Sequence, residues 1–166
     1  MKKILLNIAM VGIVIAVIII LLVSFGSSEG ARYVYKGNTA YVPVKIQPKE
    51  YQCSECNMDV EALSYAVQLI TQEGNTYFFD DIGCVVLWLE KNHPDVHSVL
   101  TQTQDTHRWI DVKKAWYSRI AASPMGYGFA AYENKKPSFI PYEEMKLLML
   151  QGKTLHDPFV KKTLLK

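Results

Sequence analysis

The sequence has little net charge and no dense group of basic residues. Its 166 residues include 18 Lys and Arg against 16 Asp and Glu, which gives a formal net charge of +2. A nucleic-acid-binding domain usually carries a clustered basic face. The near balance of charge therefore gives no support to a nucleic-acid partner.

Cysteine is also scarce, with three residues in the chain. An odd number means that not all of them pair within one molecule. No second Cys or His pair at short spacing accompanies Cys53 and Cys56, although a closed structural zinc site usually has one. His93 and His97 lie four residues apart, but Pro94 prevents them from sharing a helical face. These gaps weigh against structural zinc.

Hydrophobic residues are concentrated near the start of the sequence, in an uncharged run from Ile4 to Phe25. About 20 apolar residues span a bilayer as a helix, whereas the apolar part of a secretory signal has about 7–15. We therefore predict that residues 1–26 form an uncleaved transmembrane anchor, with a cleaved signal as the alternative. Lys2 and Lys3 precede the run, which predicts that the rest of the chain faces the periplasm from the inner membrane. No cysteine follows the run, so a lipoprotein signal is not expected.

Residues 27–50 are predicted to be a linker, and residues 51–166 a folded domain. Ser27–Gly30 has a flexible composition. The pattern that follows, residues 32–42 around Gly37 and Asn38, suggests a small hairpin.

The domain is predicted to be α+β, with two similar ββαβ units. In the first unit, two strands are joined by a Gly-Asn turn, and Asp80 or Asp81 caps a helix that Pro94 ends. Polar residues 96–106 are expected to be turn-like. The predicted elements are strands 64–71 and 76–79, helix 82–90 and strand 108–112.

The second unit is expected to repeat this order. Pro141 suits the first turn of a helix, and Gly152 suits its end. Residues 155–166 are predicted to form one last strand or a frayed terminus. The predicted elements are strands 115–120, 127–133 and 138–140, followed by the helix.

The most informative stretch holds Cys53, Cys56 and Met58. A Cys-x-x-Cys spacing serves zinc, redox disulfides and copper about equally well. A thioredoxin-like redox pair would open a helix whose dipole lowers a thiol pKa, and no long amphipathic helix is predicted here. Thiolate together with thioether selects Cu(I), and Met58 adds the thioether. A plain Cys53–Cys56 disulfide is the remaining interpretation.

Other residues are weaker candidates. Cys84, at the start of a predicted helix, is expected to be a buried core thiol, with a thiol activated by the helix as the alternative. Met125 lies in a Pro- and Gly-rich loop, where it is either a further Cu(I) ligand or a space-filling side chain. His107 is the histidine to test as an extra ligand. Asp80 and Asp81 are expected to cap the helix or to be solvated.

Four motifs in order give the chain a resemblance to the NosL family, the copper-binding accessory proteins of nitrous oxide reductase maturation. They cover roughly half of the chain. The motifs are Cys53-x-x-Cys56-x-Met58, the segment Tyr77–Cys84, Trp109-Ile110-Asp111 with Ala115-Trp116-Tyr117, and Ser123–Tyr132.

The resemblance implies two ββαβ units, as in part of the organomercurial lyases, and Cu(I) bound by Cys56 and Met58, then Met125, then Cys53. It implies a periplasmic Cu(I) chaperone, not an enzyme, that delivers copper to nitrous oxide reductase with an ABC-type membrane complex. Family members are commonly lipoproteins, whereas this chain has a predicted transmembrane run. The alternatives are a copper carrier for a different client and a membrane-anchored CxxC thiol–disulfide oxidoreductase.

Overall fold

The computed structural model describes residue 10 and residues 12–20 and 32–166. Contacts divide the chain into two units, Met1–Ala31 and Arg32–Lys166. In the first unit, residues 10 and 12–20 are helical. The other residues of the predicted anchor lie outside the described part of the chain. Among the described residues, no helix is long and apolar enough to cross a bilayer.

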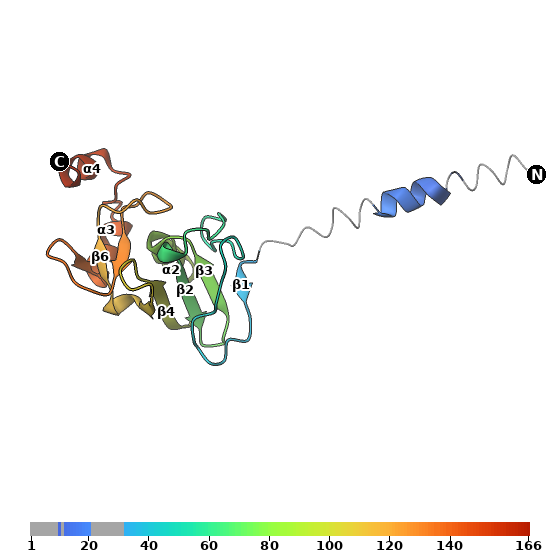
Figure 1. The fold of residues 1–166 in the computed structure, drawn as a ribbon, viewed down its shortest axis with the longest axis horizontal. Coiled ribbons are helices and arrows are strands. Elements are labelled where there is room, and N and C mark those ends of the chain that lie inside the picture. Colours follow the sequence, from blue (N-terminus) through green and yellow to red (C-terminus); the bar gives the residue numbers. More distant parts are fainter. Residues whose placement is uncertain (1–9, 11, 21–31) are drawn as a thin grey trace, which may run out of the picture. The chain divides into compact units, whose positions relative to one another are not determined.

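The second unit contains a five-stranded antiparallel sheet with the order β1-β3-β2-β4-β5 (Figure 1). All five residues of β2 are buried, so this strand forms the middle of the core. The strands are β1 Val34–Tyr35, β2 Val67–Thr71, β3 Thr76–Phe79, β4 Val96–Gln102 and β5 Trp109–Asp111.

Each predicted element of the first unit is present: strands 64–71 and 76–79 are β2 and β3, helix 82–90 is α2, and strand 108–112 is β5, but the unpredicted strand β4 lies between α2 and β5. The turn between β2 and β3 has Gly74 at φ 76°, a left-handed conformation that favours glycine. Helix α2 covers Ile82–Asn92, with the Asp81 side chain capping Gly83 N–H. It ends at His93 in a left-handed conformation, directly before Pro94.

The prediction of a turn-like segment at 96–106 is wrong for its first part, which is strand β4. Val99 and Thr101 are buried, but His97 is exposed and the other residues are half-buried. This mixed surface gives only a weak apolar alternation. Backbone pairing with both β2 and β5 makes the segment a strand, and such pairing between distant segments is invisible in the local pattern.

The predicted hairpin at residues 32–42 does not form. Val34 pairs with Tyr77 of β3 instead, and residues 39–42 are turn and irregular structure. The Asn38 amide donates to the Val42 carbonyl and to Thr76 Oγ1 at 2.8 and 3.0 Å. The side chain of Asn38 therefore fixes this segment against the sheet, and the compact unit begins at Arg32.

A second, three-stranded sheet has the order β7-β6-β8. Its strands are β6 Trp116–Ser118, β7 Ala130–Tyr132 and β8 Ile140–Pro141. Helix α3, Tyr142–Leu150, follows β8 directly, with Glu143 and Glu144 in its first turn. The chain is thus α+β, as predicted.

The predicted second ββαβ unit is wrong in its last element. No strand follows α3 in the described residues; the chain ends in helix α4, Pro158–Leu164. Asp157 caps α4 by accepting from the N–H groups of Phe159 and Val160, and Pro158 occupies its first turn. These are strong helix-start signals, and they account for a helix where a strand or frayed end was expected.

One hydrophobic core joins the two halves of the unit. Helices α2 and α3 pack together, and buried residues of both sheets surround them. The largest completely buried side chains include Tyr117, Phe78, Phe79 and Phe129. A smaller cluster around Phe78, Tyr51 and Ile46 lies between the sheet and the segment before β2.

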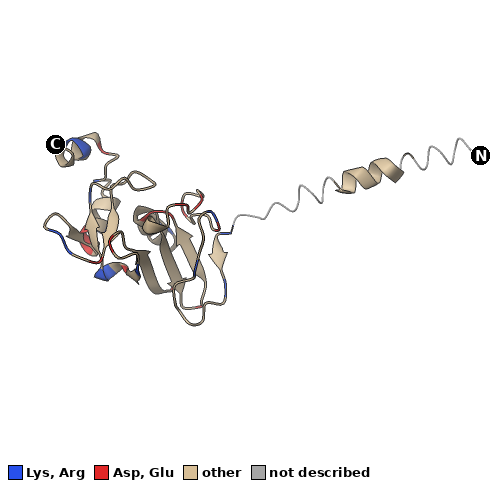
Figure 2. Cartoon of the chain, viewed as in Figure 1, with Lys and Arg blue, Asp and Glu red and all other residues tan. Residues whose placement is uncertain are grey.

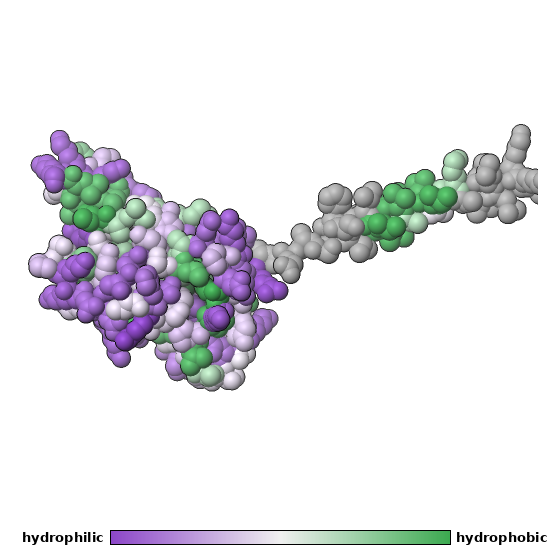
Figure 3. Space-filling model, viewed as in Figure 1, coloured by the Kyte–Doolittle hydropathy of each residue, from purple (hydrophilic) through white to green (hydrophobic). Residues whose placement is uncertain are grey.

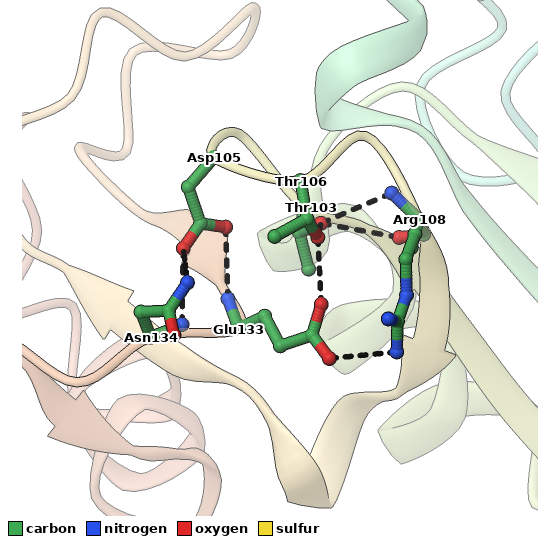
Figure 4. A network of polar contacts seen from close by, with 6 residues as sticks. All are labelled: Thr103, Asp105, Thr106, Arg108, Glu133 and Asn134. Atoms are coloured by element: carbon green, nitrogen blue, oxygen red, sulfur yellow. Dashed lines mark hydrogen bonds and ion pairs between the residues drawn. The ribbon is translucent and has the colours of Figure 1, made fainter.

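A polar network also connects the two sheets (Figure 4). Asp105, between β4 and β5, accepts hydrogen bonds from the backbone of Glu133 and from the backbone and side chain of Asn134, at 2.9–3.0 Å. Glu133 in turn accepts from Thr106 and forms an ion pair with Arg108, each at 2.7 Å. The end of β7 is thereby held against the β4–β5 loop.

Candidate metal centre

The CxxC motif lies in a small closed loop. The Cys53 N–H donates to the Met58 carbonyl at 2.8 Å, and Gln52 and Asp59 form an isolated β-bridge. Asn57 closes the turn in a left-handed conformation, with φ 63°. The Ser54 N–H donates to the Phe78 carbonyl at 2.8 Å, so the loop is fixed to β3. This geometry directs the cysteines toward the end of that strand.

The strand β3 runs directly into α2, and this junction supplies the other groups. Asp80 and Asp81 are both buried, at 2% and 0% exposure. Asp81 is the helix cap, which leaves the Asp80 carboxylate free to face the cysteine loop. Cys84, in the first turn of α2, is completely buried. The positive end of the helix dipole lies beside its thiol and favours an anionic sulfur or a bound anion there.

Four side chains meet at this junction. Ligand atoms of Cys53, Cys56, Asp80 and Cys84 all lie within 4.8 Å of one another. The Cys56 thiol is 3.6 Å from each Asp80 oxygen and donates to the carboxylate. All three cysteines are free thiols. Three sulfurs and one carboxylate in this space form a group that can hold one metal ion.

The three thiols differ in pKa because of a hydrogen bond between Cys53 and Cys84 and because of burial. A hydrogen bond from Cys84 lowers the pKa of Cys53, against the effect of its burial. The same hydrogen bond, together with burial, raises the pKa of Cys84. Burial raises the pKa of Cys56 to about 12. Cys53 is therefore the first of the three to ionise, and a cation would be needed to stabilise further thiolates.

Asp81 connects the junction to the loop that carries Met125. One carboxylate oxygen accepts from Gly83 N–H at 2.8 Å, and the other accepts from Met125 N–H at 3.2 Å. Its hydrogen bonds, which include one with Ser123, act to lower its pKa, but burial dominates and raises it. The single buried side chain thus holds the 123–128 loop beside the N-terminus of α2.

The Tyr127 ring closes the same side of the junction. A Cβ atom on Gly83 would lie 2.3 Å from Tyr127 Cδ2, so only glycine leaves room for the ring at this position. Burial, followed by the nearby Cys84 and Asp81 charges, raises the pKa of Tyr127 to about 12. The ring packs against the start of α2, and its raised pKa keeps the phenol neutral near pH 7.

A pocket of about 670 Å³ opens beside Asp80. Asp80 contributes to its wall, and so do Met58, Tyr65 and Pro124. Met58 is 44% exposed, so its thioether is accessible from solvent. Asp80 lines the pocket and also contacts the Cys56 thiol, so this one carboxylate lies between the pocket and the cysteines.

The structure brings some of the predicted ligands together. Cys53 and Cys56 lie in the cluster, whereas Met58 and Met125 belong to segments that border it. Met125 is half-buried and packs against the main core. The ligand role of all four residues remains a prediction. His107 is exposed, and no histidine of the described chain belongs to the cluster.

Sequence reasoning missed the participation of Cys84 and Asp80. Cys84 is buried, as expected, but it contacts Cys53 and is not an isolated core thiol. Asp80 neither caps the helix nor faces solvent. One signal was available: only one of two consecutive aspartates can cap a helix, which leaves the other, next to a buried strand, without a structural role.

No protein-family model matches the chain, and no protein in a search of curated sequences does. Among solved structures, the fold is similar to the crystal structure of the copper chaperone NosL from Shewanella denitrificans, with 12% sequence identity and a TM-score of 0.47. The match covers 66% of this chain and 87% of that one. The identity is too low and the superposition too loose to carry a conclusion.

Proposed function

We propose that the chain binds one Cu(I) ion at Cys53, Cys56 and Cys84 and delivers it to another protein. The observation that carries this proposal is the meeting of three free thiols from two separate segments, all within 4.8 Å together with Asp80. Thiolate ligands favour soft and borderline metals, Cu(I) and zinc among them, over harder cations. Cys56 is half-buried and contacts Asp80, which lines the pocket, and this partial exposure suits a site that must release its ion.

The thioethers of Met58 and Met125 support the choice of copper. Met58 is exposed on the pocket, and Met125 is held beside the same helix end. Met58 lines the pocket, and Met125 directly follows Pro124, which also lines it, so each places a soft thioether near the cluster. Transfer by ligand exchange would use such groups in succession, so we assign both to the entry and release of copper.

The NosL-like motifs in the sequence extend this proposal to a cellular role. On that resemblance, the domain is a membrane-tethered periplasmic chaperone, its client is nitrous oxide reductase, and an ABC-type complex takes part. The residues 1–26 would supply the tether. A different copper-requiring client is the alternative, because the motifs do not specify the partner.

A second candidate is zinc, which the carboxylate favours. Three thiolates and one carboxylate make four ligands, the number that structural Zn²⁺ takes. Replacement of Asp80 separates the two metals. A carboxylate is a good ligand for Zn²⁺ and a poor one for Cu(I), so Asp80→Asn should weaken zinc binding much more than copper binding.

The test is an anaerobic titration of the reduced full chain with Cu(I) in competition with a Cu(I)-selective chelator. We expect one tightly bound Cu(I) per chain. Cys53→Ser, Cys56→Ser or Cys84→Ser should each weaken binding by more than about a hundredfold, since even outer-shell changes cost 10–100-fold. His93→Ala, at an exposed position, is the matched control. Failure of the wild-type chain to compete with the chelator would refute the proposal.

The oxidoreductase alternative predicts a different result. It requires catalysed disulfide exchange that depends on Cys53 and Cys56 and is indifferent to Cys84. Thiol–disulfide exchange with an oxidised peptide substrate, measured for Cys84→Ser beside the wild type, therefore distinguishes the two functions.

A further inference from the structure

Helix α4 has an unusual surface for the last element of a folded domain. None of its residues is buried. Phe159 is 82% exposed and Leu165, directly after the helix, is 51% exposed. Figure 3 shows a hydrophobic area over this helix. Ile120, next to Arg119 and 55% exposed, is a further apolar residue of this half of the domain.

A groove lies between this helix and the strand β6 region. It has a volume of about 230 Å³ and is lined by Arg119, Phe159, Val160, Thr163 and Leu164. The Arg119 Nε atom is buried and has no hydrogen-bond partner. A buried donor on a guanidinium group without a partner costs free energy, and an anionic oxygen arriving from outside would satisfy it.

Basic residues accompany the apolar ones. Lys161 and Lys162 lie in the last turn of α4 (Figure 2), and Lys166 ends the chain. The nearby acid, Asp157, is occupied in capping the helix through the N–H groups of Phe159 and Val160. The surface is thus apolar with a positive border, which is the character of a helix that lies in the interface of an anionic membrane.

We propose that α4 and the groove beside Arg119 form a docking surface for an anionic phospholipid bilayer. Phe159 and Leu165 would enter the boundary between headgroups and acyl chains. Lys161, Lys162 and Arg119 would face lipid phosphates. A second copy of the chain fits less well, because a symmetric contact would bring the same basic residues together. This surface is independent of the proposed metal site.

The anchor predicted from the sequence would make a weak membrane contact at α4 sufficient to orient the domain. If residues 1–26 insert into the membrane as predicted, the domain is kept at a high local concentration near the bilayer, and a weak second contact is sufficient to orient it. Each Lys or Arg near an anionic surface strengthens attraction, and salt weakens it.

Hydrogen exchange of the full chain on vesicles tests this proposal. Exchange of the α4 amides is compared on vesicles of phosphatidylcholine with and without phosphatidylglycerol. The predicted N-terminal anchor is the same on both kinds of vesicle, so only additional docking changes the exchange of α4. We expect exchange to slow at least about tenfold on the anionic vesicles, and the effect to disappear at high salt.

Two variants and one control make the result specific. The double variant Lys161→Glu/Lys162→Glu and the variant Phe159→Ser should each lose the slowing on anionic vesicles. Leu147→Ser, at a residue of α3 that is 55% exposed, should keep it. Unchanged exchange of the α2 amides verifies that each variant is folded.

Three outcomes would overturn the proposal. The first is equal exchange of α4 on both kinds of vesicle. The second is slowing that persists in Lys161→Glu/Lys162→Glu. The third is slowing without vesicles that grows with protein concentration, which would identify a second copy as the occupant.

Discussion

Gly83→Ala is a sensitive test of how tightly the site is packed. Gly83 lies in the first turn of α2, in an ordinary helical conformation, so an alanine would normally stabilise the helix by about 0.5–1 kcal/mol. At this position, however, the added Cβ would meet Tyr127 Cδ2 at 2.3 Å, Tyr127 Cε2 at 2.8 Å and Met149 Sδ at 3.0 Å. The thioether can move, but the ring cannot without displacing the 123–128 loop.

The contacts with Tyr127 and Met149 therefore predict that Gly83→Ala lowers the stability of the domain. Overpacking of this kind costs about 1–3 kcal/mol, which outweighs the gain in helix propensity. We expect Gly83→Ala to destabilise the domain by about 1–2 kcal/mol. With a urea m-value of about 2 kcal/mol/M, the unfolding midpoint should fall by roughly 0.5–1 M.

A double-mutant cycle with Tyr127→Ala tests the cause. Once the ring is removed, Gly83→Ala should stabilise the domain by about 0.5–1 kcal/mol, so its effect reverses sign. Urea unfolding followed by tryptophan fluorescence measures all four proteins. If Gly83→Ala destabilises equally with and without Tyr127, the ring is not packed on the helix start as described, and the reasoning fails.

Three further predictions concern the residues that hold the domain in shape. Asp81→Ala should destabilise the domain by about 2 kcal/mol or more in thermal unfolding, because it removes a helix cap and the acceptor of Met125 N–H. Asp81→Asn keeps a capping oxygen and should cost less stability in the same assay. The pKa of Asp105 is lowered, since its hydrogen bonds to residues 133 and 134 outweigh the effect of slight burial. The stability that the Asp105 carboxylate adds is present above its unfolded-state pKa and is lost as pH falls through its lower folded-state pKa. Acid unfolding of Asp105→Asn should therefore lack this pH-dependent loss of stability. An acid-unfolding profile identical to that of the wild type would contradict the prediction. Gly128→Ala should cost at least about 1 kcal/mol more than Gly152→Ala, because both positions have positive φ but only Gly128 has the Arg119 carbonyl and the Leu155 side chain each 2.6 Å from the added Cβ; equal unfolding midpoints would refute this.

Local signals explain which parts of the fold were predictable. The β2–β3 hairpin and α2 follow from a Gly-Asn turn, a capping aspartate and a stop at Pro94, and all three act within a few residues. Strand β4 was missed because its backbone partners, β2 and β5, lie elsewhere in the sequence. The same reason applies to β1, whose partner is β3 and not the residues after Gly37.

The candidate site divides in the same way. Cys53 and Cys56 stand out because their spacing is itself the signal. Cys84 is 28 positions after Cys56 and looks like an ordinary core residue, so only the fold shows that α2 places it against the loop. The position of Asp80 in the cluster was equally unpredictable. It depends on which of the two aspartates caps the helix, and the local sequence leaves that choice open.

X-ray absorption spectroscopy of the Cu(I)-loaded full chain tests the central claim most directly. All three cysteines of the chain, Cys53, Cys56 and Cys84, belong to the cluster, and no histidine of the described chain does. We therefore predict a first coordination shell of two or three sulfur atoms with no imidazole nitrogen, and loss of this spectrum in Cys56→Ser/Cys84→Ser. A first shell dominated by nitrogen, or an unchanged spectrum in that variant, would contradict the account.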